Sequence, residues 1–246
     1  MTKGNKKDMN TIKNDMTNYW SQRAKKFSLL RQREFASEKH EQWLAELDRY
    51  LSPGRKLDIL DIGTGTGFFA FLLAERGHHV TGIDLTPDMI MEAKKTAGRM
   101  ALSPDFYIMD GENPDFPPRS FDAIVTRKLT WALPDLLQTY RNWHRLLKPG
   151  GILINFDADY CREKPPTSLP EHHAHQGVGE ELMKEYERMK DVLRPTQHPR
   201  PQWDVRLLAL AGFSHITVDT CVWQRIYREE DEFYDPTPGF AITATA

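Results

Sequence analysis

Short apolar runs alternate with amphipathic stretches through the middle of the chain. Five of these runs are rich in branched apolar residues and predict strands, at 56–62, 79–85, 106–109, 121–126 and 152–156. The intervening segments 67–76, a stretch beginning at 86–87, and 134–147 have helical periodicity, and Thr86-Pro87 is typical of a helix start. This alternation predicts an α/β fold with a doubly wound parallel sheet, whose ligand crevice lies at the carboxyl ends of the strands.

The flanking segments follow other patterns. Residues 1–14 are polar and predict a disordered tail, which leaves 15–246 as the folded domain. Within that domain, 15–52 predicts an N-terminal helical lid of two helices. Residues 157–204 are rich in proline, contain one strong helix at about 179–193, and are interpreted as an inserted cap over the crevice. A further helix at 205–211 precedes a predicted terminal strand pair, 215–220 with 240–245.

A glycine-rich turn carries the clearest chemical signal. Gly63, Gly65 and Gly67 follow the first strand and open the next helix, so the backbone can approach a ligand without a Cβ in the way. A dinucleotide-binding fold requires the spacing G-x-G-x-x-G, and here the third glycine comes one residue early. Asp61 also precedes the turn, and a carboxylate there suits a cationic amino group better than a pyrophosphate. The pattern favours S-adenosylmethionine and disfavours a nicotinamide dehydrogenase.

Two more carboxylates follow the next two strands. Asp84 ends the second strand, where a carboxylate can accept hydrogen bonds from both ribose hydroxyls. Asp110 ends the third strand, where it can accept from the adenine amine while Met109 or Leu85 packs on the ring. The residues that we assign to cofactor binding are Asp61, Gly63, Thr64, Gly65, Gly67, Asp84, Leu85, Met89, Asp110, Gly111 and Arg127.

The motifs taken together resemble a known family. They are Asp61-Ile62-Gly63-Thr64-Gly65-Thr66-Gly67, Gly82-Ile83-Asp84-Leu85-Thr86, Asp110-Gly111, Phe121-Asp122 and His144-Arg145-Leu146-Leu147-Lys148-Pro149-Gly150-Gly151. The chain is similar over 57–156 to the class I S-adenosylmethionine-dependent methyltransferases, in the small-molecule group that includes the ubiquinone/menaquinone C-methyltransferases. The resemblance implies a seven-stranded sheet with the last strand antiparallel. It also implies that Asp61 and the glycines hold the methionine moiety, Asp84 the ribose and Asp110 the adenine.

Three regions are candidates for the acceptor site, and each has a structural alternative. Tyr19, Trp20 and Arg23 resemble the lid of related enzymes, or they pack the first helix onto the domain. Trp131 follows the fourth strand and either lines the acceptor pocket or belongs to the core. Arg127, at the same place, either binds the carboxylate of the cofactor or of an acidic acceptor, or is a solvated charge. The cap histidines, His172 and His173 among them, contact the acceptor or lie in a solvated loop. Their spacing shows no helical i, i+4 pair with a third ligand, so we expect no metal site.

Composition narrows the function further. The chain has 33 basic and 35 acidic residues, so a nucleic-acid partner is not expected. Its two cysteines and the absence of a long apolar run indicate a cytoplasmic protein without a membrane anchor. We therefore expect methyl transfer to a small-molecule acceptor by in-line displacement, with no obligatory general base. A non-catalytic cofactor-binding module and an RNA or DNA methyltransferase are the alternatives, and the oligomeric state stays open.

Overall fold

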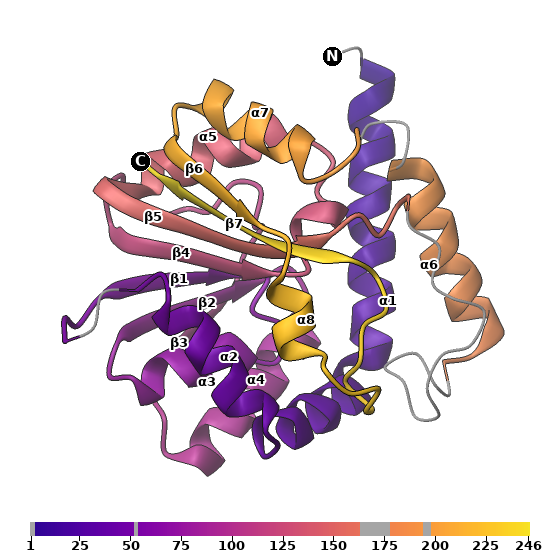
Figure 1. Cartoon of the computed structure of the whole chain (residues 1–246). Coiled ribbons are helices and arrows are strands. Elements are labelled where there is room, and N and C mark those ends of the chain that lie inside the picture. The colour runs from indigo at the N-terminus through magenta and orange to yellow at the C-terminus, as the bar shows by residue number, and fades with distance from the viewer. Residues whose placement is uncertain (1–2, 52–53, 163–177, 194–197) are drawn as a thin grey trace.

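A single mixed sheet organises the part of the chain that the computed structural model describes, residues 3–51, 54–162, 178–193 and 198–246 (Figure 1). Its seven strands lie in the order β3-β2-β1-β4-β5-β7-β6. The elements are α1 (Lys3–Phe35), α2 (Lys39–Asp48), β1 (Asp58–Ile62), α3 (Phe68–Glu75), β2 (His79–Asp84), α4 (Pro87–Met100), β3 (Asp105–Ile108), β4 (Phe121–Arg127), the 3-10 turn η1 (Thr130–Ala132), α5 (Leu136–Leu146), β5 (Leu147–Ala158), α6 (Glu180–Leu193), α7 (Gln202–Ala211), β6 (Ser214–Asp219), α8 (Val222–Ile226) and β7 (Gly239–Thr245).

Strand directions confirm the predicted fold class. β1 pairs in parallel with β2 and β4, β2 with β3, and β4 with β5. β7 runs antiparallel between β5 and β6, as the resemblance implied. Strand order reverses between β1 and β4, because the chain moves outward to β3 before it returns to β4. In an open α/β sheet, such a switch point leaves a crevice at the carboxyl ends of the two strands.

Helices cover both faces of the sheet, and each face has its own apolar core. One core joins α2, α3, α4 and α8 to strand residues such as Ile59 and Phe156. Trp43 of α2 is fully buried there, with its ring edge-on to Phe69 and Phe156. The other core joins α5 and α7 to the opposite face, around Trp143. Along β1 successive residues serve opposite cores, because side chains in a strand alternate between faces.

The N-terminal helix differs from the sequence prediction. α1 begins at Lys3, so most of the segment 1–14, predicted to be a disordered tail, is helical. Ile12 is buried in a third apolar cluster with η1 and α6, and the Lys13 ammonium donates to Asp110 at 2.6 Å. These long-range partners correct the prediction, since composition alone gave this polar segment nothing to bury.

Three smaller features also went unpredicted. α8 and η1 are short, and five or fewer residues give too little periodicity to recognise. β5 begins at Leu147, before the predicted start of this strand at 152, and the β4–β5 register shifts near its start. Of the two helices predicted in 15–52, the second corresponds to α2, which buries Trp43, Leu44 and Leu47.

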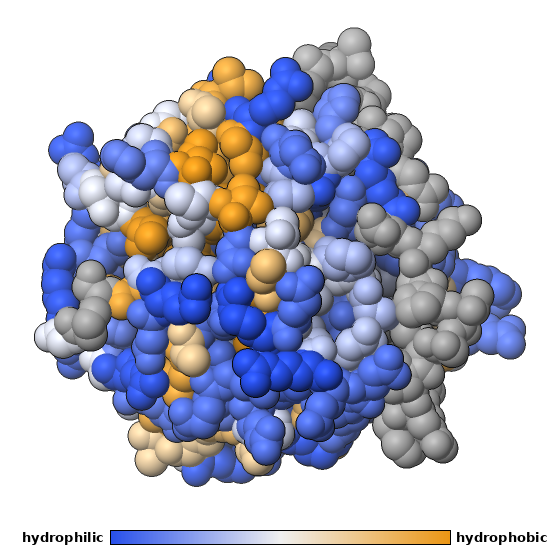
Figure 2. Space-filling model, in the orientation of Figure 1, coloured by the Kyte–Doolittle hydropathy of each residue, from blue (hydrophilic) through white to orange (hydrophobic). Residues whose placement is uncertain are grey.

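The outer edge of the sheet is the most apolar part of the face in Figure 2. Hydrophobic residues gather there near α7, β6 and β7, and the rest of that face is mainly hydrophilic. Leu210 and Val218 are exposed at 66% and 40%. In the described part of the chain, no helix has both the length and the apolar character that crossing a membrane requires.

Candidate functional site

A cavity of about 520 Å³ lies at the carboxyl ends of the strands, where the crevice was predicted. It is lined by the turns after β1, β2, β3 and β4, by α1 and α6, and by the segment before β7. Figure 1 shows α1 standing across this edge of the sheet with α6 beside it. Ten of the residues assigned to the cofactor line the cavity: Asp61, Gly63, Thr64, Gly65, Asp84, Leu85, Met89, Asp110, Gly111 and Arg127. Gly67 does not.

The glycine turn has the backbone that only glycine adopts without strain. Gly63, Gly65 and Gly67 have φ angles of 70°, 55° and 93°. A Cβ on Gly63 would lie 2.9 Å from the Leu129 side chain, and a Cβ on Gly67 would lie 2.7 Å from Phe71. Gly67 therefore serves packing against α3, while Gly63 and Gly65 form the surface that a ligand can approach.

Asp61 is the most buried acid of the site, with 2% of its surface exposed. Its carboxylate accepts a hydrogen bond of 2.6 Å from the Thr64 hydroxyl. Burial raises the pKa of Asp61 to about 7, although the Thr64 hydroxyl and the Ala70 N–H lower it. A cationic group placed here would favour the charged form of this carboxylate. The arrangement fits the predicted role of binding an amino group.

The two other carboxylates also shape their turns. Asp84 accepts from the Gly65 N–H at 3.0 Å and from the Thr86 N–H at 2.8 Å, and so joins the turn after β1 to the turn after β2. Burial raises its pKa. Asp110 accepts from the Glu112 N–H at 3.0 Å. The Lys13 ammonium of α1 pairs with the carboxylates of both Asp110 and Glu112. α1 is thus fastened to the turn that was assigned to adenine.

Arg127 ends β4 inside a cage of aromatic rings. Its guanidinium lies 4.5 Å from the centre of the Trp43 ring and 4.8 Å from that of Phe68. Nη2 donates to Glu34 of α1 at 2.8 Å, and Glu34 also pairs with Arg31. Nη1 is buried and has no hydrogen-bond partner. Arg127 therefore ties the lid helix to the sheet, and its Nη1 group keeps unused donor capacity.

The candidates for the acceptor site fall into three groups. Trp20, Arg23 and Trp131 line the cavity. Tyr19 does not, because it is fully buried, stacks on Tyr186 at 5.2 Å and accepts a hydrogen bond of 2.7 Å from Arg23. For Tyr19 the packing alternative is correct. His172 and His173 lie outside the described residues.

The sequence did not single out several residues at the acceptor end. Tyr160 follows β5, Tyr186 lies on α6, and Asp235 precedes β7, yet all three line the cavity. Lys128 lies between Arg127 and Trp131 and also lines the cavity. None of these residues stands in a motif, and they come from segments up to about a hundred residues apart. The proline-rich run before β7 was the one available signal.

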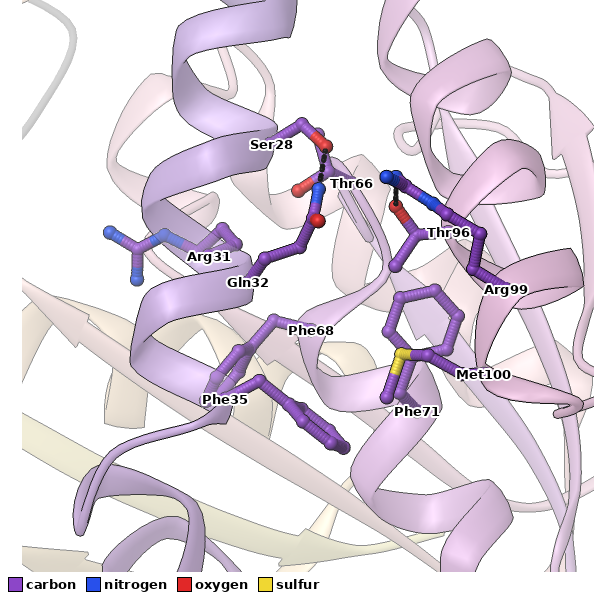
Figure 3. A pocket seen from close by; sticks show the side chains of 10 residues that line it. All are labelled: Ser28, Arg31, Gln32, Phe35, Thr66, Phe68, Phe71, Thr96, Arg99 and Met100. Carbon is purple, nitrogen blue, oxygen red and sulfur yellow. Dashed lines mark hydrogen bonds between the residues drawn. The ribbon is translucent and has the colours of Figure 1, made fainter.

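A smaller hollow of about 230 Å³ lies between α1, α3 and α4. Figure 3 shows Phe35, Phe68, Phe71 and Met100 together on its apolar side, while two hydrogen-bonded pairs, Ser28 with Gln32 and Thr96 with Arg99, form its polar side. Arg31, Thr66 and Phe68 line both this hollow and the main cavity, so they form the wall between the two. The Thr66 hydroxyl is buried without a hydrogen-bond partner.

The carboxylates of the cavity pair with hydroxyls, backbone N–H groups or ammonium groups. Nowhere in the described ranges do three or more His, Cys, Asp or Glu side chains come together as they would around a metal ion.

Comparison with known sequences points to one kind of protein. The family described as "Methyltransferase domain" matches residues 60–155. Phosphoethanolamine N-methyltransferase 1 of Arabidopsis thaliana is 38% identical over 121 residues, which is 48% of this chain and 24% of that relative. Aklanonic acid methyltransferase DauC of Streptomyces sp. (strain C5) is 34% identical over 155 residues, 55% of this chain and 70% of that relative. The chain thus spans about a quarter of the plant enzymes and over two thirds of DauC.

Solved structures show the same fold. A phosphoethanolamine N-methyltransferase 2 of Haemonchus contortus, in complex with phosphomonomethylethanolamine and S-adenosylhomocysteine, has a TM-score of 0.60 and 20% identity, over 84% of this chain and 52% of that one. A SAM-dependent methyltransferase from Aquifex aeolicus has a TM-score of 0.58 and 15% identity, over 92% and 97%. At these identities the likeness is one of fold.

Proposed function

This chain belongs to the S-adenosylmethionine-dependent methyltransferase family, and we propose that it transfers a methyl group from that cofactor to a small-molecule acceptor. One observation carries the proposal. A single cavity joins the glycine turn and its carboxylates to a second, aromatic end walled by the lid helix and α6. Cofactor and acceptor can therefore meet in one enclosed space, which methyl transfer requires.

The residues present fit the cofactor. A glycine turn at positive φ in the cavity wall, a buried carboxylate at Asp61 and an unpartnered Nη1 group on Arg127 match an amino acid moiety. In our proposal Asp61 holds the amino group, Arg127 the carboxylate, Asp84 the ribose hydroxyls and Asp110 the adenine amine. When bound, the cofactor supplies an electrophilic methyl group on a sulfonium, a good leaving group. The chain's own task is to orient the acceptor and exclude water.

The lid and cap predicted from the sequence remain proposals with structural support. Residues 15–52 contribute Met16, Trp20 and Phe27 of α1 to the cavity wall, and 157–204 contributes Tyr160 and Met183. We propose that these two segments enclose the acceptor. The cytoplasmic location stays a prediction from cysteine usage, and the absence of a nucleic-acid partner stays a prediction from charge.

The relatives' names support a small acceptor, because they include phosphoethanolamine and aklanonic acid methyltransferases. The alternatives from the sequence, a non-catalytic cofactor-binding module and a nucleic-acid methyltransferase, gain no support from them. Which acceptor this chain takes is a separate question, since similarity is concentrated in the cofactor half.

The test has two steps. Calorimetric titration with S-adenosylhomocysteine is expected to show one site per chain. Incubation with methyl-labelled S-adenosylmethionine and the small-molecule fraction of a cell extract is then expected to yield a labelled small molecule and S-adenosylhomocysteine. Binding without any label transfer would instead indicate a sensor or scaffold. No binding at all would reject the cofactor assignment.

A further inference from the structure

In the wall of the cavity, Lys128, Asp235 and Tyr160 form a hydrogen-bonded cluster. Lys128 follows β4 directly and has a φ of 56°, a conformation that a non-glycine residue rarely adopts. Its backbone is fixed on both sides: its N–H donates to the Phe156 carbonyl at 2.7 Å, and its carbonyl accepts from the Trp131 indole at 3.0 Å. Backbone strain of this kind persists where the surroundings over-determine it, often at functional sites.

Asp235 is the centre of the cluster. Its Oδ2 accepts from the Lys128 ammonium at 2.6 Å and from the Tyr160 hydroxyl at 2.5 Å, and its Oδ1 accepts from the Thr237 N–H at 3.0 Å. The side chains of Asp235 and Lys128 are 11% and 27% exposed, and all three residues line the cavity. The cluster is therefore shielded from bulk water yet open to a bound molecule.

Burial and neighbouring charges shift the pKa values of all three groups of the cluster. Burial alone would raise the pKa of Asp235, but the Lys128 ammonium and the hydrogen bonds hold it below its ordinary value. Burial and the Asp235 charge raise the pKa of Tyr160 well above its usual range. The other charged or titratable groups that act on Lys128 include Arg127 of β4, Arg31 and Glu34 of α1, and Tyr227 at the end of α8. The cluster thus consists of a carboxylate, an ammonium and a neutral phenol.

Unused hydrogen-bonding capacity gives the cluster a chemical preference. An ammonium has three N–H donors, and Lys128 places one on Asp235; a carboxylate accepts about four hydrogen bonds, and Asp235 accepts three. This count leaves N–H donors on Lys128, whose ammonium also lies 5.7 Å and 5.3 Å from the centres of the Trp223 and Tyr227 rings, and one acceptor position on Asp235. An acceptor hydroxyl group suits this pair, because it can give its proton to the Asp235 carboxylate while its oxygen, as it becomes negative, accepts a hydrogen bond from the Lys128 ammonium. A cationic amine would meet the Lys128 ammonium instead.

The surrounding walls favour a flat molecule. Trp131 lies edge-on to Tyr160 at 5.6 Å and to Tyr186 at 5.8 Å, and Phe233 and Tyr234 line the same end of the cavity. Aromatic side chains bind planar rings through offset-stacked and edge-to-face contacts. The acceptor's body and its reacting group are thus both constrained.

We propose that Lys128 and Asp235 are catalytic residues for an acceptor bearing an acidic hydroxyl on a planar framework, a phenol or an enol, with Tyr160 positioning Asp235. The inference rests on the proposed function. The acceptor O–H bond breaks as its proton passes to Asp235. The freed electron pair on oxygen forms the bond to the methyl carbon, and the pair of the breaking carbon–sulfur bond returns to sulfur. Lys128 stabilises the negative charge on the oxygen while it develops.

A coloured phenol tests this without turnover. Para-nitrophenol absorbs visible light when it ionises, so its ionisation in the protein can be followed directly. With S-adenosylhomocysteine bound, the wild-type protein is expected to bind the phenolate and to shift its ionisation to lower pH. Lys128→Met is expected to weaken phenolate binding by about tenfold, the effect of one charge-assisted hydrogen bond. Lys184→Met removes an exposed cation of α6 that pairs with Glu181 and does not line the cavity, and it should leave the probe's affinity unchanged.

Several outcomes would overturn the inference. Equal losses in the two lysine variants would mean that only general positive charge matters. Equal affinity of the wild-type protein for para-nitroaniline, which has the same shape without an acidic hydroxyl, would exclude recognition of the hydroxyl even if Lys128→Met failed to fold. S-adenosylhomocysteine binding is measured first on each sample. Its failure rejects the proposed function, whereas its success with no Lys128-dependent probe binding rejects only this inference.

Two further variants separate the roles. Asp235→Asn keeps the shape and removes the proton acceptor, so phenolate binding should persist while methylation of a phenolic acceptor becomes slower at neutral pH and recovers as pH rises and the acceptor ionises in solution. Tyr160→Phe should leave the pH profile unchanged and lower the rate only a few-fold. A pH profile of Asp235→Asn parallel to the wild type would show that Asp235 takes no proton.

Discussion

The two ends of the cavity are built in different ways. At the cofactor end, the glycine turn, Asp84 and Asp110 each follow a neighbouring parallel strand, so their positions are fixed by the sheet itself. At the acceptor end, the lining residues come from α1, α6 and the segments after β4, after β5 and before β7. The cofactor end is a property of local motifs, whereas the acceptor end is an assembly of distant segments. Variation in the acceptor end can therefore change the substrate without disturbing the sheet.

The largest expected effect concerns the support of the acceptor end. Arg200 is fully buried and pairs with Asp204 at 2.6 Å and with Asp157 at 3.3 Å, beneath the turn that carries Trp131. Arg200→Met leaves two buried carboxylates without their cation, and we expect a loss of about 3–5 kcal/mol in the free energy of unfolding. Denaturant titration measures it. Arg206→Met on the exposed side of the same region is the control, and equal effects would contradict the importance of burial.

The next effect concerns the cofactor end. Gly63→Val introduces a Cβ 2.9 Å from Leu129 and a branched residue at positive φ. We expect S-adenosylhomocysteine to bind about a hundredfold more weakly, because the turn must move. Gly77→Val is a matched control, since Gly77 has a φ of 83° and open space around it. That control should lose stability through strain and keep its affinity for the ligand.

The ribose assignment predicts an intermediate effect. Asp84→Ala should weaken S-adenosylhomocysteine binding by about 1–3 kcal/mol through lost charge-assisted hydrogen bonds, as measured by calorimetry. Asp105→Ala removes an exposed carboxylate at the start of β3 and should change nothing. An unchanged affinity of Asp84→Ala for S-adenosylhomocysteine would contradict the assignment of the ribose hydroxyls to Asp84.

Asp61 makes ligand binding depend on pH. Its folded-state pKa of about 7 lies above the ordinary value of 3.8. Between pH 3.8 and pH 7, Asp61 is therefore protonated in the folded, ligand-free protein and ionised in the unfolded chain. The free energy of unfolding therefore falls as pH rises through that window. A bound ammonium favours the carboxylate, and with this pKa the charged fraction of Asp61 rises about fivefold from pH 6 to pH 7, so S-adenosylhomocysteine should bind about fivefold more tightly at pH 7. Asp61→Asn should flatten most of this slope; an identical slope would assign it to another group.

The smallest effect tests the wall between the two hollows. Thr66→Val replaces an unpartnered buried hydroxyl by a methyl group of similar shape, so stability should rise or fall by less than about 1 kcal/mol. Thr64→Val, two residues earlier, removes the hydroxyl that donates to Asp61 and should destabilise the protein at pH 8, where that acid is charged. Thermal unfolding of the pair at one pH distinguishes them. A large loss in Thr66→Val would reveal a partner for its hydroxyl.

Sequence reasoning succeeded where a residue's role follows from its neighbours in the chain. The strands, the reversal of strand order and the acids at the ends of β1, β2 and β3 were all predicted, because periodicity and motif spacing are local properties. It was wrong on the segment 1–14, where Ile12 and Lys13 find partners about a hundred residues away. Tyr19 and Trp20 show the same limit, since adjacent positions on one helix point into the core and into the cavity.

The amino-acid sequence by itself determined the sheet, the glycine turn and the identity of the cofactor, because each depends on residues close together in the chain. Only the tertiary structure decided that Asp235 meets Lys128 across 107 positions, and that Tyr160 joins them. The reason is physical: a strand and its turn are fixed by local backbone preferences, whereas a hydrogen bond between distant segments exists only after the sheet has ordered both.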